Sequence, residues 1–174
     1  MNEIPTRNAY GDAIVEEGKR NKDVVLIDAD IAKSTRSYKF HTEYPERAFN
    51  MGIAEQNMIN VAAGMASSGL NVFTNTYAVF ASMRAAEQVR TFVCYPNLNV
   101  TVVASHGGLQ VSYDGVTHQA TEDIAIMNSF PNMTIVQPTD PVITKKATKA
   151  LVGNNGPAYL RLTRNSVPNL YEED

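Results

Sequence analysis

Two hydrophobic periodicities alternate along the chain. Continuous apolar runs, of which Val24–Ile27 is the clearest, are typical of strands buried on both faces of a sheet. Longer segments with apolar residues three or four positions apart are typical of helices. The runs predict strands at 24–27, 71–74, 99–105, 133–136 and 158–162. The periodic segments predict helices at 6–21, which Thr6 can cap, and at 53–67, 80–94 and 141–151.

This order of elements predicts the fold class. Strands that alternate with helices imply a mostly parallel sheet flanked by helices, a three-layer α/β sandwich. A chain of 174 residues is long enough for one domain with its own core, so we predict a single domain over 1–174. In such folds ligands bind beyond the carboxyl ends of the strands.

Composition and charge exclude several classes of protein. The chain is 44% hydrophobic and 19% charged, with a net charge of -3 and no long run of one sign, which argues against nucleic acid or an anionic membrane as partner. No apolar run approaches the roughly 18–20 residues that span a bilayer, and the polar N-terminus is unlike a signal peptide. The single cysteine, Cys94, excludes an internal disulfide and fits a reducing compartment. We therefore predict a cytoplasmic protein.

The segment 106–119 departs from the alternation. It contains two of the three histidines, His106 and His118, with Asp114 between them. A loop of this length in a compact domain is usually functional or disordered. Two histidines and one aspartate without a second cluster are a weak case for a metal site. Binding of a hydroxylated substrate fits better, because these side chains pair readily with hydroxyl groups.

Glu55 has two interpretations. It stands where a loop becomes a helix, and an acidic residue in a first turn stabilises the helix dipole by about 0.3–1 kcal/mol. A catalytic carboxylate would need a partner, which the next segment offers. Tyr77, Phe80 and Met83 are three apart and share one face of a helix. They are either a core stripe or a surface on which a flat heteroaromatic ring stacks beside the carboxylate.

Signals for phosphate binding are few. Arg164 falls at or beyond the end of the last strand, where it either grips a phosphate or is simply solvated. The chain has no glycine-rich phosphate fingerprint, no nucleophile elbow and no cysteine pair for zinc. We therefore find no evident means of holding a diphosphate or its magnesium on this chain.

Four motifs in register resemble the transketolase family. They are Gly52–Gln56, Thr76–Phe80, Asp114–Gln119 and Leu162–Arg164. The resemblance runs from about residue 7 to 168 and is to the central, pyrimidine-binding domain, which lies in the C-terminal section of transketolases that occur as two chains. It implies the fold of thiamine-diphosphate-binding domains.

The resemblance also implies a cofactor site. Glu55 matches the glutamate that hydrogen-bonds the aminopyrimidine of thiamine diphosphate and thereby activates the cofactor. Tyr77 and Phe80 match the aromatic pocket around the pyrimidine, and Met83 stands where some relatives carry another aromatic residue. Glu55 and His118, which matches the histidine close to the reacting carbons, are the predicted catalytic residues.

Substrate positions carry over in the same way. Asp114 matches a carboxylate that recognises a sugar hydroxyl, and His106 a histidine nearer the phosphate end. Ser112–Tyr113 replaces the Gly-Glu pair that the family commonly has before Asp-Gly, so the resemblance does not extend to the choice of sugar. The predicted phosphate-binding residues are Arg7, Ser34 and Arg164.

The resemblance implies half of an active site. Family enzymes bind the diphosphate and Mg²⁺ on a separate domain, so no metal ligand is expected here. The expected partner is an N-terminal transketolase section, with a homodimer and sugar phosphate substrates of the pentose phosphate pathway. We predict two-carbon ketol transfer in that complex. The alternatives are a fragment of 1-deoxyxylulose-5-phosphate synthase and a non-catalytic association domain.

Overall fold

The predicted strands form one parallel sheet. The computed structural model describes residues 3–172. The strands of the sheet are β2 (Val24–Asp28), β3 (Ala48–Asn50), β4 (Asn71–Tyr77), β5 (Val100–Ser105), β6 (Thr134–Val136) and β7 (Ala158–Arg161). Their order is β3-β2-β4-β5-β7-β6, and every neighbouring pair is parallel. The prediction of a mostly parallel sheet is confirmed.

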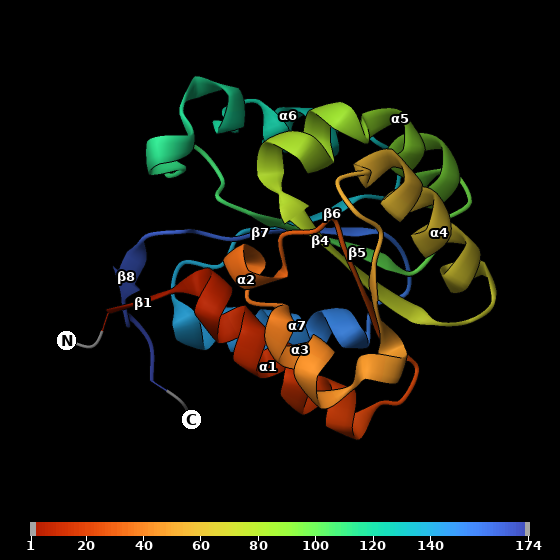
Figure 1. Ribbon diagram of the computed structural model, residues 1–174, viewed down its shortest axis with the longest axis horizontal. Coiled ribbons are helices and arrows are strands. Elements are labelled where there is room, and N and C mark those ends of the chain that lie inside the picture. The colour runs from red at the N-terminus through yellow and green to blue at the C-terminus, as the bar shows by residue number, and fades with distance from the viewer. Residues whose placement is uncertain (1–2, 173–174) are drawn as a thin grey trace.

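Helices cover both faces of this sheet (Figure 1). On one side lie α1 (Thr6–Arg20), α3 (Tyr38–Glu43) and α7 (Pro141–Val152). On the other lie α4 (Glu55–Ser67), a helical run over 80–94 and α6 (Asp123–Asn128). A single turn, α2 (Ala32–Thr35), follows β2. The three-layer α/β fold is therefore confirmed, whereas the domain boundaries at 1 and 174 lie outside the described residues and stay a prediction.

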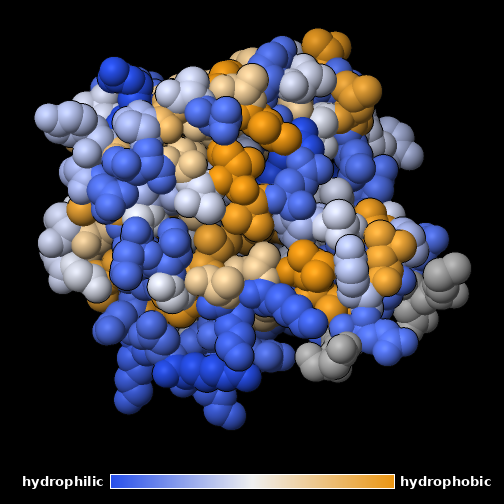
Figure 2. Space-filling view, turned by 180° about the vertical axis from the view of Figure 1, so that it is seen from behind, coloured by the Kyte–Doolittle hydropathy of each residue, from blue (hydrophilic) through white to orange (hydrophobic). Residues whose placement is uncertain are grey.

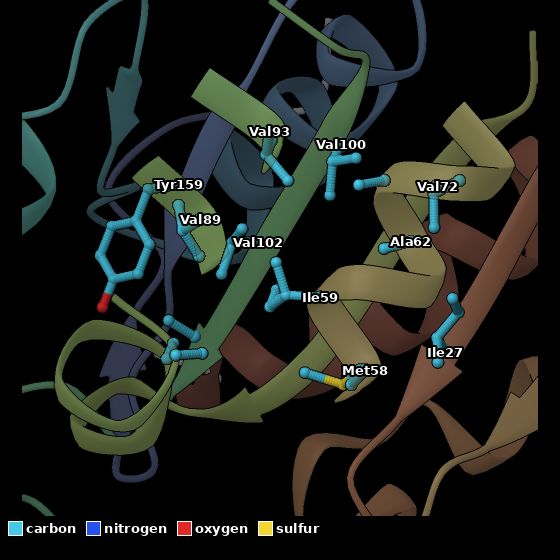
Figure 3. Close-up of a cluster of buried hydrophobic side chains, with 14 of the residues drawn as sticks. Ile27, Met58, Ile59, Ala62, Val72, Val89, Val93, Val100, Val102 and Tyr159 are labelled. Atoms are coloured by element: carbon cyan, nitrogen blue, oxygen red, sulfur yellow. The ribbon is translucent and has the colours of Figure 1, made fainter. Parts of the chain in front are cut away.

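The larger hydrophobic cluster lies between the sheet and α4. Figure 3 shows Val72, Val100 and Val102 of adjacent strands facing Ile59 and Ala62 of α4, and all five are fully buried. The alanines of α4 allow the helix to approach the sheet closely. This packing holds α4, and with it Glu55 at its first position, against the sheet.

A second cluster lies on the opposite face. Phe73 and Val103 are neighbours in sequence of Val72 and Val102, yet they pack towards Tyr10 of α1. Successive residues of a strand point to opposite faces, so burial on both faces requires apolar residues at every position. This explains the continuous apolar runs of the sequence.

The helix predicted over 80–94 is interrupted. It consists of the π-helical segments Phe80–Arg84 and Val89–Cys94 on either side of α5 (Ala86–Gln88). The N–H of Ala85 donates to the carbonyl of Phe80 at 3.1 Å, the i→i+5 bond of a π-helix. Such wide turns change which side chains share a face, with consequences for the site described below.

The two ends of the described chain are tied together. β1 (Glu3–Pro5) pairs antiparallel with β8 (Ser166–Pro168) in a ribbon separate from the main sheet. Thr6 does not cap α1 as predicted: it is the first helical residue, and its hydroxyl accepts from the N–H of Thr163 at 2.7 Å. The hydroxyl therefore links the two ends of the described chain instead of capping the helix.

Hydrophilic and hydrophobic residues are unevenly distributed over the face of the molecule seen in Figure 2. Figure 2 shows hydrophilic residues crowding the lower edge of the molecule, whereas hydrophobic ones run through the middle of this face. Among residues 3–172, no helix combines the length and apolar character needed to cross a membrane.

Asp140 joins α7 to the segment after β8. As the N-cap of α7 it accepts from the N–H of Ile143 at 2.7 Å, and its other oxygen accepts from those of Leu170 and Tyr171 at 2.8 and 2.9 Å. Burial alone would raise the pKa of this carboxyl, but these backbone donors outweigh it and hold the pKa below its ordinary value.

Replacing Asp140 with alanine should lower the free energy of unfolding by about 1–2 kcal/mol, because both the cap and the tail contacts are lost. Urea denaturation at pH 7 measures this. The contribution of a carboxyl with a lowered pKa is present above its unfolded value of 3.8 and is lost as the pH falls through the folded value, so the difference from wild type should shrink below about pH 4. The exposed Asp23→Ala serves as control, and an equal loss in that variant would contradict the assignment.

Candidate functional site

The predicted site residues gather at the carboxyl edge of the sheet. Parallel strands end at the same edge, so residues that follow β4, β5 and β7 meet there. Tyr77 is the last residue of β4, His106 follows β5, and Arg164 lies three residues beyond β7. The site thus draws on segments far apart in the sequence.

Glu55 is a buried carboxylate with two partners. It is the first residue of α4 and is 2% exposed. Its Oε1 accepts from the hydroxyl of Thr76 at 3.3 Å, and its Oε2 accepts from Nη1 of Arg84 at 2.8 Å. The helix-dipole interpretation is compatible with this position, but it does not require the carboxylate to be buried or paired.

An aromatic surface lies beside this carboxylate. The rings of Tyr77 and Phe80 are stacked, with centroids 6.1 Å apart. The guanidinium carbon of Arg84 lies 4.1 Å from the centre of the Phe80 ring. Met83, the third residue of the predicted stripe, is instead 50% exposed. The π-helical turn explains the difference, since its wider winding places the fourth residue after Phe80, rather than the third, over the ring.

The loop after β5 folds back over the aromatic rings. His118 meets Phe80 edge-on, with centroids 5.1 Å apart, and lies 6.0 Å from Tyr77. Reciprocal backbone hydrogen bonds between Gly108 and Ala120, of 2.8 and 3.0 Å, close the base of the loop. Both members of the predicted catalytic pair therefore lie near Phe80: the ring of His118 contacts it directly, and Glu55 bonds the Arg84 side chain that lies over it.

A buried ion pair supports the base of this loop. Nε of Arg161 donates to Asp123 at 2.7 Å, and Nη2 donates to the carbonyl of Ala120 at 3.1 Å. A Cβ on Gly107 would lie 2.7 Å from the Arg161 side chain, so only glycine allows this close approach. The loop is thus anchored on β7 through a residue that the sequence patterns did not single out.

His106 is held in an unusual conformation. It is 2% exposed, and its backbone φ of +62° is rare for a residue with a side chain. Its ring lies 4.3 Å from that of Tyr77. Nδ1 lies 2.8 Å from the hydroxyl of Ser105, and Nε2 lies 3.2 Å from Nη1 of Arg7. Burial first, and then the nearby cations Arg7 and Arg164, lower the pKa of His106 to about 3.

A basic pocket of about 330 Å³ opens next to His106. Sequence analysis predicted six of its residues and missed two basic ones, Lys33 and Arg36. Its lining residues are Arg7, Lys33, Ser34, Arg36, Tyr77, His106, Asp114 and Arg164. Burial and then the charges of Arg36 and Arg164 lower the pKa of Arg7. Cations that repel one another in a pocket create a site for an anion.

The residues that sequence analysis missed differ in how readily a pattern could have found them. Thr76 lies on β4 two residues after Thr74, so strand alternation alone would have placed it on the α4 side with Val72. Arg84 stands four residues after Phe80, a spacing that also places side chains on one face of an α-helix, but the predicted stripe followed a spacing of three and passed over it. Within residues 3–172, no group of three or more His, Cys, Asp or Glu is arranged to hold a metal ion.

Comparison with known proteins identifies the family of this chain. Residues 2–169 match the family model of the transketolase pyrimidine binding domain. A provisionally named transketolase C-terminal section of Methanocaldococcus jannaschii is 45% identical over 97% of this chain and 53% of its own length. A 1-deoxy-D-xylulose-5-phosphate synthase of Desulfotalea psychrophila is 37% identical over 89% of this chain and 24% of its own length.

A solved structure gives the same result. A split-gene transketolase, described as an inactive β4 tetramer, superimposes with a TM-score of 0.89 at 46% identity, over 99% of this chain and 56% of its own. This chain therefore spans about half the length, or less, of the relatives compared. The family match over nearly the whole chain, together with the buried glutamate beside stacked aromatic rings, leads to one conclusion: the chain belongs to the transketolase family and is a pyrimidine-binding domain of that family.

Proposed function

We propose that this chain is the pyrimidine-binding part of a thiamine-diphosphate-dependent transketolase that transfers a two-carbon ketol unit between sugar phosphates. The observation that carries the proposal is the buried carboxylate of Glu55, whose Oε2 already bonds a planar N–H donor that lies over Phe80. An aminopyrimidine is also planar and nitrogen-bearing, so these two residues fit it. When bound, thiamine diphosphate supplies the nucleophilic carbon of the reaction.

Each site residue of this chain would have its own role in binding the cofactor and the substrate. Glu55 would hold a proton between its Oε2 and the ring nitrogen, and Thr76 fixes the other oxygen of the carboxylate at 3.3 Å. Phe80 and Tyr77 would bind the flat ring, and the exposed Met83 would border it. His118, at the edge of both rings, would face the reacting carbons of the sugar.

The basic pocket would hold the anionic end of the substrate. Arg7, Ser34 and Arg164 line it and would bind the phosphate of a sugar phosphate, and Asp114, which also lines it, would accept from a hydroxyl group. The pocket adjoins Tyr77, which also stacks on Phe80. A ligand that extends from the aromatic surface to the pocket would therefore pass His106.

The protonation of His106 follows from its partners. Arginine can only donate hydrogen bonds, so Nε2 must accept from Arg7 and Nδ1 must carry the proton, which it donates to Ser105. A neutral ring agrees with the lowered pKa of about 3. If a bound sugar displaced Arg7, Nε2 of His106 would offer the sugar a hydrogen-bond acceptor rather than a positive charge.

A partner would supply the rest of the site. We infer an N-terminal transketolase section that binds the diphosphate and Mg²⁺, because the related structure is a split-gene transketolase whose described β4 form is inactive. This chain without that partner should likewise be inactive, as a homodimer or a larger assembly. We expect it in the cytoplasm, where its one thiol, Cys94, is inert because burial raises its pKa to about 12.

Glu55→Gln should lower ketol transfer by about 10²–10⁴-fold, because the amide cannot hold the required proton. The assay combines the chain with its diphosphate-binding partner, thiamine diphosphate, Mg²⁺, a ketose phosphate and an aldose phosphate. Glu16→Gln, on the exposed side of α1, is the matched control and should keep full activity. Full activity of the Glu55 variant would contradict its role.

The same assembly tests the alternative chemistry. Release of carbon dioxide from pyruvate, without ketol transfer, would favour 1-deoxyxylulose-5-phosphate synthase. Failure of a properly assembled complex to bind thiamine diphosphate at all would favour a non-catalytic association domain.

Arg164→Met should raise the KM for a phosphorylated aldose by about tenfold or more and change kcat less, because a cation that grips the substrate phosphate is lost. The KM of the same sugar without phosphate should hardly change. Equal losses for both sugars would place Arg164 outside the phosphate site.

His106 should lower stability in acid. A histidine with a depressed folded pKa contributes stability above its unfolded value of 6.5 and loses it progressively down to about 3. The free energy of unfolding should therefore fall between pH 6.5 and 4 with a slope on the order of 1 kcal/mol per pH unit from this group. Urea denaturation of wild type and His106→Gln at pH 7 and 5 measures it, and an unchanged pH dependence in the variant would contradict the buried neutral ring.

A further inference from the structure

Arg84 occupies the place that the proposed function gives to the cofactor ring. Its Nη1 donates to Oε2 of Glu55 at 2.8 Å, and its guanidinium lies over Phe80 at 4.1 Å. Both are residues to which the proposed function assigns the aminopyrimidine. Neither contact has a role in that function while a pyrimidine ring is bound.

The guanidinium and the aminopyrimidine are alike in the properties that matter here. Each is flat and carries N–H donors in its plane, so each can hydrogen-bond a carboxylate while it stacks on an aromatic ring. Oε1 of Glu55 is already engaged by Thr76. The two groups would therefore compete for Oε2 and for the adjacent face of Phe80.

The burial of Glu55 explains why the chain needs a cation such as Arg84 beside it. A carboxylate that is 2% exposed and unpaired would strongly destabilise the fold, and without the cofactor only a side chain of this chain can compensate it. Asp123 offers a comparison, because this equally buried carboxylate pairs with Arg161. The Arg161 side chain is only 14% exposed, whereas that of Arg84 is 43% exposed. Arg84 can therefore leave into solvent, and Arg161 cannot.

We propose that Arg84 is a surrogate for the aminopyrimidine: it fills the cofactor subsite of the empty chain, neutralises Glu55, and is exchanged for the cofactor ring when the site is loaded. This inference rests on the proposed function. It gives Arg84 two effects of opposite sign. It stabilises the chain without cofactor, and it raises the apparent Kd for the cofactor by the inverse of the fraction of time for which the subsite is free.

The first test uses the chain alone and does not depend on the cofactor. Thermal unfolding is compared for wild type, Arg84→Met, Glu55→Gln and the double variant. Arg84→Met should lower the melting temperature by several degrees in the wild-type background and have little effect when Glu55 is already glutamine. The exposed Arg90→Met is the matched control on the same helical run and should have little effect in either background. Equal effects of Arg84→Met in both backgrounds would overturn the pairing.

The second test measures exchange directly. Binding of thiamine diphosphate with Mg²⁺ to the complex with the diphosphate-binding partner is followed by calorimetry. Arg84→Met should bind several-fold more tightly than wild type; if Arg84 fills the subsite about nine-tenths of the time, the gain is about tenfold. Unchanged or weaker binding would overturn the exchange while leaving the proposed function intact. No binding by the wild-type complex would overturn both the exchange and the proposed function. The thermal unfolding of the four variants of the chain alone would still show whether Arg84 and Glu55 form an ion pair.

Discussion

Burial of a parallel sheet on both faces is the constraint on which the structure depends. Two helical layers cover the faces, so polar chemistry is displaced to the edge where the strands end. Buried carboxylates lie in segments that follow or flank this edge, among them Asp28 at the end of β2, Glu55 on α4 and Asp123 on α6. Each must be compensated by groups of this chain, because water cannot reach it.

The three carboxylates are compensated in the same manner. Each accepts from at least one hydroxyl group and from one nitrogen side chain of another segment. Asp28 pairs with Ser37 at 2.6 Å and His41 at 2.9 Å, and Asp123 with Tyr159 and Arg161, both at 2.7 Å. Glu55 follows the pattern through Thr76 and Arg84, but its nitrogen partner is the most exposed of the three. The site is thus a modified form of a structural device that the fold uses elsewhere.

Elements with strong periodicity could be predicted from the sequence, and elements fixed by tertiary contacts could not. The run Val24–Ile27 and the helix of α4 are recognisable because burial imposes their patterns. The three-residue strand β3 and the single turn α2 carry too few residues to form a pattern. Met83 was predicted to join Tyr77 and Phe80 on the assumption of an α-helix, whereas the π-helical turn brings Arg84 to the ring instead. Lys33 and Arg36 enter the basic pocket only because the segment after β2 folds towards α1, which no local pattern encodes.

The ribbon of β1 and β8 has a mechanical consequence. Its strands are antiparallel, with Glu3 opposite Pro168, so the two ends of the described chain leave from the same side (Figure 1). A force that pulls these ends apart would open the ribbon one hydrogen-bonded pair at a time, like a zipper, instead of shearing all pairs at once. The bonds from Leu170 and Tyr171 to Asp140, then the ribbon, and then the link between Thr6 and Thr163 would be loaded before the parallel sheet. Such a force would therefore be absorbed at this corner before it reached the sheet that positions Glu55.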